Sequence, residues 1–98
     1  MIAVVETVDK IEPSHGPDFG ETIVNLWGSG FLDSPLLSCQ FGTVSISAVW
    51  HRDDLVECQT PPMPAGTEVA IRIANNGIDF STSFLVFKYY GNLDLRFS

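Results

Sequence analysis

The chain has 98 residues, of which 45% are hydrophobic, so it is long enough for one domain with its own core and too apolar for a disordered segment. Its five basic residues are scattered and outnumbered by twelve acidic ones, for a net charge of −7, which argues against binding to nucleic acid or an anionic membrane. No apolar run reaches the roughly 18 residues of a membrane-spanning helix. The first residues lack the basic flank and long apolar stretch of a signal peptide, so we expect a module of a longer protein.

Short strand-like segments recur along the chain between Gly, Pro, Asn and Asp, and no useful stretch has the period of a helix. This punctuation predicts an all-β sandwich of two antiparallel sheets. In chain order, strands are expected at residues 4–11, 22–27, 36–41, 44–50, 55–59, 68–74 and 84–90, with a turn-rich loop at 14–20 and a polar turn at 51–54. The strands at 68–74 and 84–90 are expected to form an antiparallel hairpin. We expect a single domain over residues 1–91, followed by a tail or linker over residues 92–98.

Alternation within these strands predicts which side chains face the core, because successive residues of a strand point to opposite faces. The expected inward residues are Val24, Leu26, Val69, Ile71, Ile73, Leu85, Phe87 and Tyr89. The expected outward apolar residues form two rows, Ile23 with Trp27, and Phe84 with Val86 and Tyr90. Exposed apolar patches often mark contact sites, so these five residues are the candidate interaction surface. Cover by the N-terminal strand or the C-terminal tail is the alternative for the first row. Trp50 is expected to cap the edge of the core.

The two cysteines, Cys39 and Cys58, each lie in an expected strand. Each shares its side-chain parity with apolar neighbours, Leu37 and Phe41 for the first and Val56 for the second, so both sulfurs are expected in one core. We predict a disulfide between them, which implies an oxidising compartment. A pair of reduced, buried cysteines is the alternative, because free cysteine is among the most buried residue types.

A series of short motifs follows in a recognisable order. They are Val8-x-x-Ile11-x-Pro13-x-x-Gly16-Pro17-x-x-Gly20-x-Thr22, Leu26-x-Gly28-x-x-Phe31, Cys39-x-Phe41-Gly42, Val56-x-Cys58-x-Thr60-Pro61-Pro62, Asn76-Gly77 with Phe80-Ser81, and Phe87-x-Tyr89. Together they resemble the IPT/TIG domain, the immunoglobulin-like module of plexins and related receptors and of some transcription factors. The resemblance covers about residues 4–90 and implies an immunoglobulin-like β-sandwich of the E-set type. It departs from the family at Glu21, where a second glycine commonly precedes the threonine, and this affects the local turn.

No motif for catalysis or metal binding accompanies this pattern. His15 and His51 have no second ligand at metal-ligand spacing, and Asp53-Asp54 lacks the alternating oxygen ligands of a calcium loop. No nucleophile motif and no phosphate-binding loop are present. We therefore expect no enzyme activity, no cofactor and no metal.

With the resemblance, these absences favour a noncatalytic extracellular module of a cell-surface or secreted protein. It is expected to act as a spacer and protein-interaction unit, as one of several tandem repeats, in contact with adjoining domains and an unknown protein ligand. Two alternatives stay open. One is a dimerisation or DNA-contact domain of a transcription factor. The other is an accessory domain of a polysaccharide-degrading enzyme that contacts glycan through Trp27 or Trp50.

Overall fold

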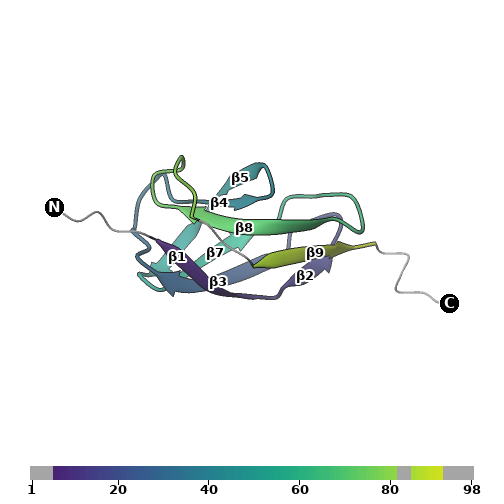
Figure 1. Cartoon of the computed structure of the whole chain (residues 1–98), viewed down its shortest axis with the longest axis horizontal. Helices are drawn as coiled ribbons and strands as arrows, with labels where there is room; N and C mark the ends of the chain where they lie inside the picture. The colour runs from purple at the N-terminus through teal and green to yellow at the C-terminus, as the bar shows by residue number, and fades with distance from the viewer. Residues whose placement is uncertain (1–5, 82–84, 92–98) are drawn as a thin grey trace.

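The computed structural model describes residues 6–81 and 85–91, which form two stacked sheets and contain no helix (Figure 1). A four-stranded sheet has the order β1-β3-β7-β6, and a five-stranded sheet has the order β2-β9-β8-β4-β5. All pairs are antiparallel except β2 with β9. The strands are β1 (Thr7–Glu12), β2 (His15–Pro17), β3 (Ile23–Ser29), β4 (Ser38–Phe41), β5 (Val44–Ser47), β6 (Val49–Arg52), β7 (Leu55–Gln59), β8 (Glu68–Ala74) and β9 (Val86–Tyr90). The predicted fold class is confirmed.

Two of the predicted strands have the expected bounds, β7 and β8. The predicted hairpin is also present, because β8 pairs antiparallel with β9 and places Val69 opposite Phe87. Residues 4 and 5 of the first predicted strand lie outside the described residues, as does Phe84 at the start of the last one.

The prediction of one strand over residues 44–50 is wrong, because the chain changes sheets there. β5 pairs with β4 in the five-stranded sheet, whereas β6 pairs with β7 in the four-stranded sheet. Between them, the Ala48 amide leaves the ladder and donates to the Leu37 carbonyl at 3.0 Å. Both strands have the same two-residue period, so alternation alone cannot reveal the change of sheet.

The prediction of a loop over residues 14–20 is wrong in part. His15–Pro17 forms the short strand β2, which pairs in parallel with β9. Proline lacks the backbone donor of a ladder and is therefore found at sheet edges, where β2 lies. Because two of its three residues are glycine and proline, which are uncommon in strands, the sequence pattern does not predict β2. The polar turn is likewise shorter than expected, because β6 extends to Arg52.

The core fills the space between the sheets and follows the predicted parity. Val24, Leu26, Ile71, Ile73 and Phe87 are fully buried, and Tyr89 is nearly so. Phe31 enters from the connection between β3 and β4 and is 1% exposed. Phe87 makes edge-on ring contacts with both Phe41 and Tyr89.

Candidate interaction surfaces

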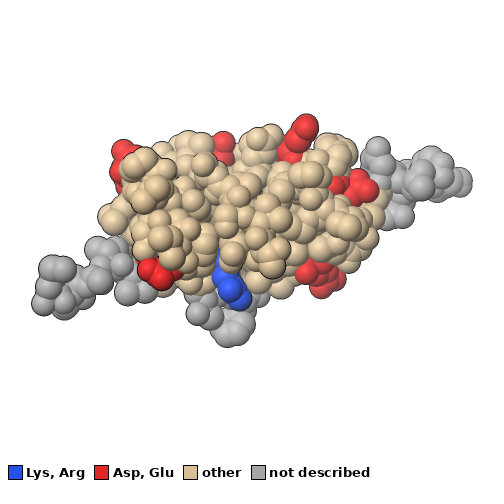
Figure 2. All heavy atoms as spheres, turned by 90° about the horizontal axis from the view of Figure 1, so that it is seen from above, with Lys and Arg blue, Asp and Glu red and all other residues tan. Residues whose placement is uncertain are grey.

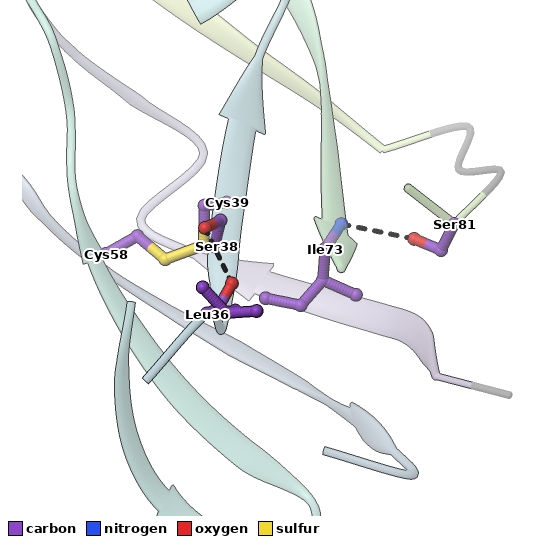
Figure 3. The surroundings of a disulfide bond; sticks show 6 residues. All are labelled: Leu36, Ser38, Cys39, Cys58, Ile73 and Ser81. Atoms are coloured by element: carbon purple, nitrogen blue, oxygen red, sulfur yellow. Dashed lines mark hydrogen bonds between the residues drawn. A yellow bond between two sulfur atoms is a disulfide. The ribbon is translucent and has the colours of Figure 1, made fainter. Parts of the chain in front are cut away.

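A disulfide joins the two sheets through the middle of the core. Cys39 lies on β4 beside Ile73, and Cys58 lies on β7 beside Val24, so the bond crosses from one sheet to the other (Figure 3). Their Cα atoms are 6.5 Å apart and both residues are at most 1% exposed. The predicted pairing is confirmed, and neither sulfur is available as a thiolate nucleophile or metal ligand.

The first candidate row lies on the outer face of the four-stranded sheet, as parity predicts. Ile23 is opposite Gln59 on β7 and is 46% exposed. Trp27 is opposite Leu55 and is partly buried. Asn25 lies between them on the same face. This row therefore offers one freely exposed aliphatic side chain and one partly covered indole.

The N-terminal strand supplies the cover of Trp27. β1 lies beside β3 in the same sheet and pairs Lys10 with Trp27. The Lys10 ammonium lies 5.1 Å from the centre of the indole ring, which is the geometry of a cation–π contact. The ammonium also approaches Glu12 at 3.8 Å in an exposed ion pair. The indole face is thus covered by an exposed cationic side chain.

The two described members of the second candidate row, Val86 and Tyr90, lie on β9 in the five-stranded sheet. Val86 is 39% exposed, and Tyr90 is partly buried, with its ring centre 6.1 Å from that of His15. Lys88 separates them on β9, opposite Glu68 on β8. Phe84, the third predicted member, lies outside the described residues.

Trp50 lies at the open edge of the sandwich, where it was expected to cap the core. Its indole N–H donates to the Phe31 carbonyl at 3.1 Å, which ties β6 to the connection between β3 and β4. The side chain is opposite the buried Val56 and is 36% exposed. The ring therefore closes one side of the core and keeps one edge in solvent.

Sequence patterns missed three exposed apolar side chains in the connections that follow β3 and β8. Leu32, Leu36 and Ile78 are 47%, 57% and 77% exposed. The Asn75 side chain ties the connection after β8 to the connection between β3 and β4, because its Oδ1 accepts from the Leu32 amide and its Nδ2 donates to the Gly30 carbonyl, both at 2.9 Å. These side chains lie in loops, where no residue periodicity predicts which side chains are exposed. The sequence signal that could have predicted them was the presence of leucine and isoleucine among turn residues.

The titratable residues of the described chain show no arrangement typical of catalysis. His51 Nε2 lies 3.1 Å from Glu57 Oε1 on the exposed sheet face. No three His, Cys, Asp or Glu side chains gather as a metal site requires within residues 6–81 and 85–91. Burial raises the pKa of Tyr89 to about 12, and a hydrogen bond from Thr60 partly opposes this rise. The Tyr89 hydroxyl donates to the Pro61 carbonyl at 2.8 Å, so it has a structural role.

None of the described segments forms a helix long and apolar enough to cross a membrane.

Two sheets that enclose one core and are joined by a buried disulfide define an immunoglobulin-like β-sandwich. Residues 7–89 match the family described as the IPT/TIG domain, and the chain belongs to that family. No curated protein sequence gives a significant match.

Among solved structures, the chain is similar to the full extracellular region of plexin A4. A structure of domains 1 to 10 has a TM-score of 0.73 and 20% identity, over 89% of this chain and 7% of that one. A structure of domains 1 to 8 has a TM-score of 0.70 and 21% identity, over 87% of this chain and 8% of that one. The chain therefore spans less than a tenth of those plexin chains, and at this identity the likeness concerns the fold.

Proposed function

We propose that this chain is a noncatalytic extracellular module of a larger cell-surface or secreted protein, in which it acts as a spacer and a protein-interaction unit. The observation that carries the proposal is the path of the chain through the sandwich. β1 begins with Thr7 opposite Ser29, at one end, and β9 finishes with Tyr90 opposite Pro17, at the other end (Figure 1). A module entered and left at opposite ends can be joined in series with others without a sharp return of the chain.

The buried disulfide supports an extracellular setting, because such bonds persist in oxidising compartments. The acidic composition supports solubility and disfavours contact with nucleic acid. The family membership and the plexin likeness are consistent with a place in a receptor chain.

The contact surface that we assign to this role is the outer face of the four-stranded sheet around Ile23 and Trp27. Burying an exposed aliphatic side chain in an interface supplies about 1.5–3 kcal/mol. Displacement of Lys10 from the indole gives the partner a flat aromatic surface, and Glu12 and Glu57 border it with negative charge. We therefore expect a partner surface that is apolar at its centre and basic or neutral around it.

The test compares the isolated module with a longer chain that contains the neighbouring domains. Ile23→Ala should change the unfolding free energy of the isolated module by less than about 1 kcal/mol, because half of the side chain is already in water. The same change should reduce protection of this face from hydrogen exchange in the longer chain. Val86→Ala provides the comparison with the second candidate row, because Val86 has similar exposure on the opposite sheet.

Equal effects of the two changes in the longer chain would show that this face has no special role. If Ile23→Ala unfolds the isolated module, the side chain belongs to the fold and the assignment of the surface is wrong. Trp27→Ala is less discriminating, because the loss of its contact with Lys10 affects the module itself.

A further inference from the structure

The sandwich has four edge strands, and three of them have features that hinder pairing with another strand. β1 contains charged side chains and a register shift between Val8 and Lys10. β6 has a register shift between Trp50 and Arg52 and ends in a cation. β2 is three residues long and ends in Pro17. Charges, bulges, prolines and short edges are the devices by which proteins prevent association of sheet edges.

The fourth edge strand, β5, has no charge, no proline and no register shift. It pairs with β4 in continuous register from Val44 opposite Phe41 to Ser47 opposite Ser38. Its other side faces no strand of the described chain, because β5 ends the order of its sheet. The uncharged character extends well beyond the strand, since residues 34–50 contain no Asp, Glu, Lys or Arg in a chain of net charge −7.

Exposed apolar side chains also lie on β5 and near it in the chain. Val44, Val49 and Trp50 are 38%, 54% and 36% exposed and lie on β5 and on the strand that follows it. Figure 2 views the molecule from the side on which β5 lies in Figure 1, and its central area is largely uncharged, with acidic residues and a basic side chain toward the rim. An uncharged sheet edge beside exposed apolar side chains has the composition of a contact site.

We propose that β5 is a self-association edge, at which the β5 strands of two copies pair antiparallel about a two-fold axis and join two five-stranded sheets into one. The residue pattern of β5 favours a second copy as the occupant, and the neutral edge keeps the repulsion between the two copies small. Two molecules of net charge −7 repel each other, and they meet with least repulsion where both surfaces are neutral. A basic partner is instead attracted to the acidic rim.

The strand is also self-complementary under a two-fold axis. Ser45 and Ser47 share the outer face of the sheet, and Val44 and Ile46 share the other face. Antiparallel pairing of identical strands places serines near serines and aliphatic side chains near aliphatic side chains, and such cross-strand pairs stabilise a ladder. Because only four residues form β5, the contact is small, and we expect a weak, concentration-dependent dimer.

The test is sedimentation equilibrium of the 98-residue chain across micromolar to millimolar concentrations. The average mass should rise toward twice the monomer mass and should go no further, because each copy has one such edge. Added salt should strengthen the association, since it screens repulsion between the acidic molecules. An interface made of ion pairs would respond to salt in the opposite direction.

Two variants locate the contact. Ser45→Lys and Ser47→Lys each place a cation on the exposed outer face of β5, so that the cations of the two copies lie close to each other near the two-fold axis, and each should weaken association at least tenfold. Ser14→Lys is the matched control, because it makes the same charge change at the exposed corner between β1 and β2. It should leave association unchanged or slightly stronger, since it reduces the net negative charge. Thermal melting of each variant checks that it is folded.

Hydrogen exchange of the β5 amides provides a measurement without substitution. Amides that face away from β4 should exchange more slowly at high concentration than at low concentration, while those at the edge of β1 should not change. A chain that is monomeric at every concentration overturns the proposal, as does association that persists in both β5 variants. Equal weakening by Ser14→Lys and Ser45→Lys also overturns it, because the effect then comes from net charge and not from the edge.

Discussion

Glu21 has a left-handed backbone, with φ of 66°, and is the only non-glycine residue with positive φ among the described residues. Gly20 before it has φ of 83°, so two successive residues adopt this conformation between β2 and β3. The Glu21 amide donates to the Thr60 carbonyl at 2.9 Å, which fixes the turn against the connection between β7 and β8. The Glu21 side chain is exposed and is not used in this contact. We predict that Glu21→Gly stabilises the protein.

The magnitude follows from two opposing terms. A left-handed backbone costs an L-residue about 1–2 kcal/mol, and this cost is absent in glycine. Glycine has more freedom in the unfolded chain, which costs about 0.5–1 kcal/mol. The midpoints of these two ranges give a net gain of about 0.75 kcal/mol, and for a domain of this size each kcal/mol raises the melting temperature by about 4–8 °C. A second glycine is also what IPT/TIG domains commonly have at this position.

The assay is denaturant unfolding of the wild type, Glu21→Gly and a control, Glu68→Gly. Both variants lose one exposed glutamate and one negative charge, so the change in net charge is the same. Glu68 lies on β8, where glycine is unfavourable by about 0.5–1 kcal/mol. The two variants should therefore move in opposite directions. If Glu21→Gly destabilises the protein as much as Glu68→Gly does, the backbone strain inferred at residue 21 is absent and the reasoning is wrong.

Two other predictions concern the core. Replacing both Cys39 and Cys58 with alanine should reduce the unfolding free energy by about 3 kcal/mol, the loop-closure value for their separation, and a loss below about 1 kcal/mol in nonreducing denaturant melts would contradict this. Tyr89 should make stability fall in alkali: burial raises its pKa from 10.0 to about 12, so the folded protein retains a proton that the unfolded chain releases. Its contribution is complete below pH 10 and is lost through about pH 12, by about 2–3 kcal/mol. Unfolding free energies measured across this range should fall more steeply in the wild type than in Tyr89→Phe, and equal slopes would refute the assignment.

Strand positions and the core were largely predictable because the sequence alternates where one face of a strand is buried. β7 and β8 have the predicted bounds, and Cys58 on β7 has the predicted inward parity. The disulfide followed from the same parity applied to two strands. Glycine and proline predicted the ends of strands, because proline restricts the backbone and glycine frees it whatever the neighbouring residues are.

The changes of sheet could not be predicted in this way. At Ala48 the chain moves from one sheet to the other, and the alternating pattern continues through the change. A two-residue period indicates that a segment is extended, but it does not specify the strand that pairs with it. The identity of an edge strand depends on that pairing, so the contrast between β5 and the other edges emerges only from the topology.

For the candidate surface, the sequence likewise predicts the direction of single side chains but not the neighbours that cover them. Parity placed both Ile23 and Trp27 on an outer face, and the structure agrees for both. Their availability nevertheless differs, because the register of β1 brings Lys10 over the indole, and that register includes a shift between Val8 and Lys10. Without the shift, Asp9 would be opposite Trp27, and the ring would have no cation above it. The exposure of an outward side chain therefore depends on the strand beside it. For this reason the direction of the side chain could be deduced from the sequence, whereas its availability for binding could not.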